Sequence, residues 1–193
     1  MKVLVTGAGG LIGSEASKYF LSKGDKVIGI DNDMRSEFFG KKGSVKKTIS
    51  ALESIKGYDH LYGDITSENQ MSSIFNHHRP DVVIHCAAQP SHDKAASIPI
   101  VDFKVNAFGT INLLENARKY CNKDAVFIHM STNKVYGDGP NHLEMLESEK
   151  RYDFKEDIFL NGIDESFSID NCLHSLFGAS KVSGDIIAQE YGK

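Results

Sequence analysis

The residues that decide the fold begin the chain: positions 1–13 read MKVLVTGAGGLIG. Lys2–Thr6 is a short apolar run, typical of a strand buried on both faces. Glycines follow at positions 7, 10 and 13, where a sharp turn leaves room for a phosphate that a Cβ would obstruct. The amphipathic stretch Leu11–Ser22 then predicts a helix whose N-terminus directs free N–H groups at that phosphate.

The spacing of these glycines is G-x-x-G-x-x-G, because Ile12 stands where a G-x-G-x-x-G motif needs its third glycine. Asp31 ends the second predicted strand, where a carboxylate can accept from the ribose hydroxyls of an adenosine and repel a 2′-phosphate. We therefore predict NAD as the cofactor. Arg35 leaves NADP as an alternative, and an ordinary turn aspartate is the structural alternative for Asp31.

Apolar runs and amphipathic stretches alternate along the rest of the chain. This order predicts an α/β fold, a Rossmann-like doubly wound parallel sheet with right-handed crossovers. Gly137–Asn171 is long and weakly periodic, which is typical of a functional lid or insertion. The expected strands are Lys2–Thr6, Lys26–Ile30, His60–Tyr62, Val82–His85 and Ala125–Met130, and the expected helices are Leu11–Ser22, Val45–Ile55, Ser67–His77, Pro99–Tyr120 and Leu173–Tyr191.

Composition excludes several classes of protein. The chain has 193 residues, 40% of them hydrophobic and 25% charged, with a net charge of −4. The hydrophobic and charged fractions are typical of globular proteins and argue against disorder. The negative net charge argues against a nucleic-acid partner. We expect no membrane span and no signal peptide, since no apolar run is long enough. Three widely spaced cysteines predict a reducing, cytoplasmic compartment and no metal site.

Six motifs are spread along the chain: TGAGGLIG at 6–13, GDI at 63–65, HCAAQ at 85–89, NAFGT at 106–110, STNKVYG at 131–137 and FGASK at 177–181. Together they resemble the extended short-chain dehydrogenase/reductase superfamily, and within it the NAD-dependent nucleotide-sugar epimerases and dehydratases. The string at 131–138 and the segment at 161–166 are most similar to the CDP-paratose (tyvelose) 2-epimerase family.

The resemblance implies a cofactor site built from many segments. Asp64 and Ile65 are expected beside the adenine, and Asn106 is expected to help anchor the active-site lysine, although a satisfied core asparagine is an equal alternative. The expected cofactor-binding residues are Gly7, Gly10, Leu11, Ile12, Gly13, Asp31, Asn32, Asp64, Ile65, Ala87, Ala88, Gln89, Asn106, Ser131 and Lys181.

The expected catalytic residues are Thr132, Lys181 and Phe177. Thr132, predicted to end the fifth strand, would bond the substrate hydroxyl, and Lys181 would hold the nicotinamide ribose. Phe177 occupies the position of the family's tyrosine in Tyr-x-x-x-Lys, so the usual general base is missing. Replacements left open are Tyr136, His174, Lys134 and a water held by Thr132 and Lys181.

The resulting functional hypothesis is an NAD-dependent nucleotide-sugar epimerase, acting on a CDP-sugar at C2 through a transient ketone. Asn133 and Lys134 replace the Asp-Glu pair of 4,6-dehydratases, which disfavours dehydration. The alternatives are a non-catalytic NAD or nucleotide-sugar binding module, and a sugar-nucleotide reductase or dehydrogenase. By resemblance, residues 1–193 form the NAD-binding domain without the C-terminal substrate domain, their activity alone is doubtful, and a homodimer is possible.

Overall fold

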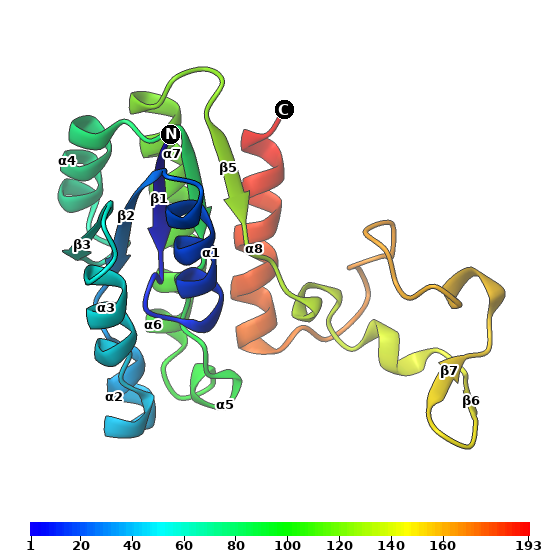
Figure 1. The fold of residues 1–193 in the computed structure, drawn as a ribbon. Helices are drawn as coiled ribbons and strands as arrows, with labels where there is room; N and C mark the ends of the chain where they lie inside the picture. The colour runs from blue at the N-terminus through cyan, green and yellow to red at the C-terminus, as the bar shows by residue number, and fades with distance from the viewer.

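The computed structural model describes all 193 residues and contains a five-stranded parallel sheet (Figure 1). Its strands lie in the order β3-β2-β1-β4-β5, so the order reverses between β1 and β4. That reversal creates the crevice where open α/β sheets bind ligands. The strands are β1 (Lys2–Thr6), β2 (Lys26–Asp31), β3 (Tyr58–Tyr62), β4 (Val82–His85) and β5 (Val126–His129).

Helices cover both faces of the sheet, and the alternation of side chains along each strand explains how. Val3 and Val5 of β1 pack in a core with Leu21 of α1 (Leu11–Ser22), whereas Leu4 packs on the opposite face with Phe75. Phe75 belongs to α4 (Glu68–His78), which lies beside α7 (Gly109–Tyr120). The prediction of a doubly wound parallel sheet is confirmed.

The long helix expected over Pro99–Tyr120 is continuous but consists of three consecutive helical segments. It consists of α6 (Pro99–Phe103), a π-helical segment (Lys104–Phe108) and α7. π-Helical segments place one extra residue in a turn and frequently occur at functional sites. Here the segment contains Asn106, whose side chain is buried.

Other boundaries shift by a few residues. The helix expected over Val45–Ile55 is α3 (Lys46–Glu53), and the C-terminal helix α8 spans Ser175–Tyr191. Two short helices were not expected, α2 (Arg35–Phe39) and α5 (His92–Ala95). Strand β5 ends at His129, before the expected Met130, and forms an edge of the sheet on which Val126 and Ile128 are exposed.

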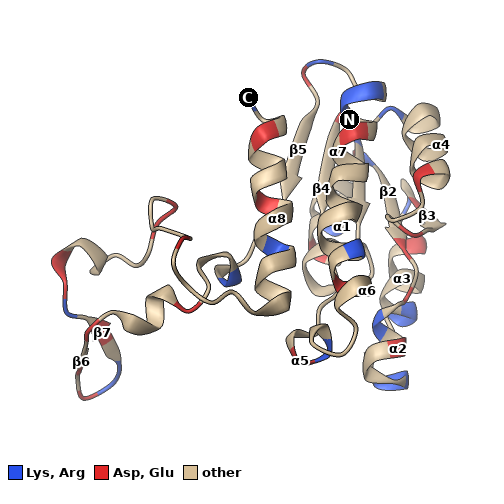
Figure 2. Ribbon diagram, turned by 180° about the vertical axis from the view of Figure 1, so that it is seen from behind, with Lys and Arg blue, Asp and Glu red and all other residues tan.

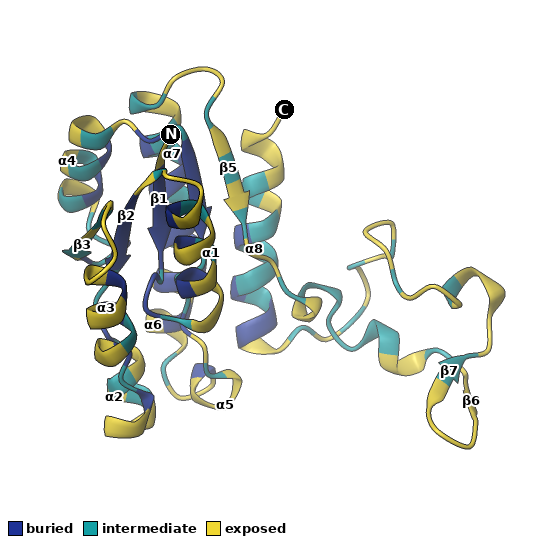
Figure 3. Ribbon diagram, viewed as in Figure 1, coloured by how far each residue is buried: buried dark blue, intermediate teal, exposed yellow.

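The segment predicted to be irregular, 137–171, extends away from the sheet and is largely exposed (Figures 1 and 3). It holds a small antiparallel hairpin of β6 (Met145–Glu147) and β7 (Tyr152–Phe154). Phe159 contacts both Phe154 and Phe167, and Phe167 contacts Tyr136. No helix of the structure is long and apolar enough to cross a membrane.

Candidate functional site

The glycine turn is closed by backbone contacts that leave no room for side chains. Gly7 has a φ of +67°, and its N–H donates to the carbonyl oxygen of Ile30 at 2.8 Å. A Cβ on Gly7 would lie 2.8 Å from the nitrogen of Ala87, and one on Gly13 would lie 2.2 Å from the oxygen of Gly7. These glycines therefore bring β1, β4 and the start of α1 into direct backbone contact.

The turn forms one wall of a cavity of about 240 Å³ at the carboxyl ends of the strands. The N–H groups of the first turn of α1 have no acceptor inside the helix, and Gly10 supplies no side-chain cap. Together they form a cradle with partial positive charge that suits a phosphate. The predicted residues lining this cavity are Gly7, Gly10, Leu11, Ile12, Gly13, Asp31, Asn32, Asp64, Ile65, Ala87 and Ala88.

Asp31 lies at the end of β2 beside the turn. Its Oδ2 accepts from the N–H of Gly9 and its Oδ1 from the N–H of Asp33, both at 2.9 Å. Both interpretations of this residue therefore have structural support, since it orders a turn and also lines the cavity. Each carboxylate oxygen has a second lone pair, so the group can still accept from a ligand hydroxyl.

Asp64 and Ile65 line the cavity on the far side of β2. Asp64 Oδ1 accepts from the N–H of Thr66 at 2.8 Å, which fixes the turn after β3. The carbonyl oxygen of Ile65 accepts from Asn112 of α7 at 2.7 Å. The turn that would contact an adenine is thus anchored to the sheet's helical layer.

Several lining residues were not among the predicted site residues. Met34 and Arg35 lie at the start of α2 and Val45 directly precedes α3, and basic residues gather on these two helices (Figure 2). Val45 packs on the turn so closely that a Cβ on Gly9 would lie 2.6 Å from its Cγ2. Gly9, the additional glycine within the stretch 7–13, could have signalled this contact, because a side chain there would meet Val45.

Gln89 and Asn106 do not line the cavity; both are buried around a carboxylate that sequence reasoning missed. Asp102 Oδ1 accepts from Gln89 Nε2 at 2.9 Å and from Asn106 Nδ2 at 3.0 Å, and Asp102 Oδ2 accepts from the hydroxyl of Ser180. Burial raises the pKa of Asp102, against the lowering effects of these donors and of Lys181. Asp102 precedes Asn106 by one helical turn, and this spacing could have indicated that the two side chains lie on one face of the helix and contact each other.

A chain of buried hydrogen bonds connects the cavity wall to the π-helical segment. Thr110 donates to the carbonyl oxygen of Asn106 at 2.6 Å, so it must accept from Nε2–H of His85 at 3.0 Å. His85 Nδ1 then accepts from Thr6 at 2.8 Å, and Thr6 accepts from the N–H of Ala87. Burial holds the pKa of His85 well below its usual range, so this imidazole is neutral.

Ser131 and Thr132 lie in a different place from the one the sequence predicted. Thr132 does not end β5, because the strand stops at His129 and Thr132 instead caps the 3₁₀ turn Asn133–Tyr136, accepting from Lys134 N–H. Ser131 donates to Asp185 of α8. Both residues line a separate hollow between this turn and α8. Ser131, expected to contact the cofactor, therefore does not line the glycine-lined cavity.

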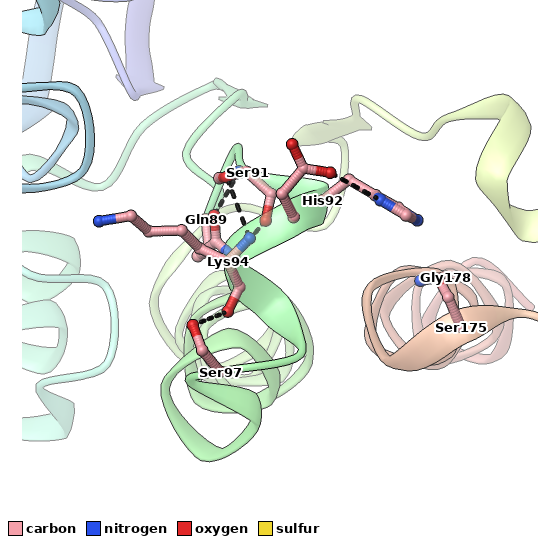
Figure 4. A network of polar contacts seen from close by, with 8 residues as sticks. Gln89, Ser91, His92, Lys94, Ser97, Ser175 and Gly178 are labelled. Carbon is pink, nitrogen blue, oxygen red and sulfur yellow. Dashed lines mark hydrogen bonds and ion pairs between the residues drawn. The ribbon is translucent and has the colours of Figure 1, made fainter.

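Phe177 and Lys181 face each other on α8, as their spacing predicts. The Lys181 ammonium lies 5.6 Å from the centroid of the Phe177 ring, and burial lowers the pKa of Lys181 to about 8, although Asp102 opposes this shift. On another side, the His92 imidazole meets the Phe177 ring edge-on, with centroids 5.7 Å apart. Figure 4 shows His92 extending from its loop toward α8 at Ser175 and Gly178. Nothing in the sequence signalled this contact, which joins the start of α5 to α8.

Two proposed replacements for the missing tyrosine are held by other partners. Tyr136 donates to the carbonyl oxygen of Asp164 at 3.1 Å, and its pKa is raised, chiefly by burial. His174 Nε2 bonds the carbonyl oxygen of Ile169 at 2.9 Å. Lys134 has an exposed side chain, and its carbonyl oxygen lies against Gly178.

Comparison with known proteins agrees with this geometry. The family described as GDP-mannose 4,6 dehydratase matches residues 4–154. A CDP-paratose 2-epimerase of Salmonella typhi is 34% identical over all of this chain and 53% of its own length. A UDP-glucose 4-epimerase of Klebsiella pneumoniae is 32% identical over 72% of this chain and 95% of that sequence.

Among solved structures, the UDP-glucose 4-epimerase of Thermus thermophilus in complex with NAD aligns with a TM-score of 0.70. The two are 25% identical, and the alignment covers all of this chain and 51% of the other. This chain thus spans about half the length of that structure and of the Salmonella relative.

Proposed function

This chain belongs to the extended short-chain dehydrogenase/reductase family of nucleotide-sugar epimerases and dehydratases. We propose that it binds NAD as the cofactor-binding part of a nucleotide-sugar epimerase. The proposed substrate is a CDP-sugar, inverted at C2 through a transient ketone. Support for the finer assignment comes from the Salmonella relative, named a CDP-paratose 2-epimerase, which aligns over the whole chain.

The observation that carries the proposal is the glycine-lined cavity with Asp31 at its edge. The residues present fit a dinucleotide, because a Cβ at Gly7 or Gly13 would fill the cradle and the first turn of α1 offers unpaired N–H groups. Asp31 is positioned to favour a 2′-hydroxyl over a 2′-phosphate. When bound, NAD supplies a reversible hydride acceptor, and the protein supplies orientation and electrostatics.

The roles proposed for Lys181, Asn106 and Gln89 follow from charge, hydrogen bonding and burial. Lys181 is proposed to hold the nicotinamide ribose, with its ammonium kept in place by the Phe177 ring and by the nearby Asp102 charge. Asn106 anchors this arrangement by bonding Ser180, the residue before Lys181, at 3.0 Å. Gln89 is proposed to support the cofactor loop through its buried side chain, since that side chain does not reach the cavity.

Epimerisation is preferred to dehydration because of the turn after β5. The dehydratases use an Asp-Glu pair there as general acid and general base, and Asn133 and Lys134 supply neither a carboxyl group nor a negative charge. Phe177 favours the second candidate, a non-catalytic module that binds NAD or a nucleotide sugar. A net reductase or dehydrogenase is the third.

We further propose that residues 137–171 close over the bound nucleotide sugar as a lid and that two copies dimerise through α6 and α8. The aromatic contacts among Phe154, Phe159 and Phe167 give the projecting segment a small core of its own. On α6, Ile100 and Phe103 are 81% and 53% exposed, and on α8 Leu176 is 53% exposed. Such apolar exposure supports a pairing surface.

Calorimetry and product analysis test the function. The natural full-length polypeptide should bind NAD more tightly than NADP and should convert one of a panel of CDP-, UDP-, GDP- and dTDP-sugars to its epimer. Binding without conversion supports the non-catalytic module, and stoichiometric formation or consumption of NADH supports the reductase or dehydrogenase. Failure to bind NAD refutes the proposal.

A further inference from the structure

The position of the missing tyrosine is bordered by a histidine that sequence reasoning did not single out. Phe177 has no proton to accept or donate, so a hydroxyl oxidised at this place needs another base. Two polar side chains contact the Phe177 ring: Lys181 holds a charge over its face, while His92 brings an imidazole to it from the loop after β4. An imidazole can accept a proton near neutral pH and pass it back.

The His92 imidazole is available for this task. Its side chain is 52% exposed, its Nδ1 lies 3.6 Å from the Asp93 carboxylate, and its Nε2 has no hydrogen-bond partner within the chain. The Asp93 carboxylate of the same helix lies beside the imidazole, and the Lys181 ammonium lies against the Phe177 ring that the imidazole contacts. His174, in contrast, has its Nε2 engaged by the carbonyl oxygen of Ile169.

The backbone beside His92 is fixed by a side chain. Gln89 accepts from the N–H of Ser91 and donates to the carbonyl oxygen of Ser91 at 2.9 Å, so it holds both polar groups of the residue before His92 (Figure 4). The Ser91 hydroxyl then caps α5 by accepting from Lys94 N–H. A loop with its backbone held in this way can present a side chain in a defined position.

The same buried carboxylate connects this loop to α8. Asp102 accepts from Gln89 on one oxygen and from Ser180 on the other, and Ser180 directly precedes Lys181. Asp102 is 1% exposed. The distance between the His92 loop and the helix carrying Phe177 and Lys181 is therefore set by one hydrogen-bonded hub.

We propose that His92 is the general base of the reaction, in place of the tyrosine hydroxyl that Phe177 lacks. This role rests on the proposed function. In the oxidation step the substrate O–H bond breaks and its proton passes to Nε2 of His92. The adjacent C–H bond breaks with transfer of hydride to the oxidised nicotinamide, and a C=O bond forms. The reverse step returns the proton from His92 and the hydride to the opposite face, which restores both groups.

The test compares H92Q, the double variant H92Q/F177Y and the control H77Q in the natural full-length polypeptide. His77 is an exposed histidine on α4, away from the site. H92Q should lower the rate of NADH formation in a single turnover by about 10²–10⁴-fold, the usual contribution of a general base. NAD affinity should stay unchanged, H77Q should behave as the parent, and F177Y should restore at least part of the rate in the H92Q background.

A second readout does not depend on turnover. The Cε1–H resonance of His92, identified by its loss in H92Q, should shift in the NMR spectrum when CDP-glucose is added to the complex with NAD. An H92Q rate equal to that of the parent, or an unshifted resonance on binding of CDP-glucose, overturns the role of His92. Failure of the parent protein to bind NAD instead refutes the proposed function, and the role falls with it.

Discussion

Gly13→Ala should damage both stability and cofactor binding, because the turn has no space for a methyl group. The added Cβ would lie 2.2 Å from the oxygen of Gly7, 2.9 Å from its carbonyl carbon and 3.0 Å from Cα of Ala8. All three are backbone atoms, so α1 must move away from β1 by about 1 Å to reach ordinary contact distances. Overpacking of this kind costs about 1–3 kcal/mol, which corresponds to about 2–12 °C in Tm for a chain of this length.

The same movement separates the N–H groups of α1 from the phosphate they would bind. Loss of one charged hydrogen bond costs about 1.5–3 kcal/mol, so the affinity for NAD should fall by about 10- to 100-fold. Differential scanning calorimetry and titration calorimetry on the same sample measure both effects. Gly10→Ala is the matched control for stability, because its Cβ would lie 3.2 Å from the same oxygen and needs only a small adjustment. A Gly13→Ala protein with the parent's Tm and NAD affinity would refute the reasoning.

Three further outcomes are expected. Asp31→Ala should reduce the preference for NAD over NADP by about 1–3 kcal/mol, since it removes an acceptor and a repulsive charge; calorimetry with both nucleotides measures it, and tighter NADP binding by the parent would contradict the assignment. The lowered pKa of Lys181 means that the unfolded chain binds more protons between about pH 8 and 10.5. Its contribution to the free energy of unfolding should therefore rise with pH across that range, by up to about 1.4 kcal/mol per pH unit, and denaturant titrations should show no such rise in K181M relative to the parent. The pKa of His85 is held below 6.5, so its contribution to stability is present above pH 6.5 and lost on acidification. The parent should lose stability as the pH falls below 6.5, and an H85Q variant with the same acid dependence would show that another group is responsible.

The sequence alone determined the nucleotide-binding half of the molecule, and local physics explains why. Strand Lys2–Thr6, helix Leu11–Ser22 and strand Val82–His85 have the predicted bounds. Their apolar periodicity and the intervening glycines are properties of consecutive residues, which need no knowledge of distant segments. Eleven of the predicted cofactor residues line one cavity because strand ends in a parallel sheet meet at one edge.

Tertiary structure decided what the remaining side chains contact. Gln89 follows a cavity-lining motif, yet its amide is buried against Asp102, because a loop with unpaired backbone groups needs a partner that only folding provides. Thr132 caps a turn because β5 ends at His129. His92 reaches Phe177 only once Asp102 has joined the loop after β4 to α8. Such contacts join residues far apart in the chain, and their register depends on how the layers pack, which no local pattern encodes.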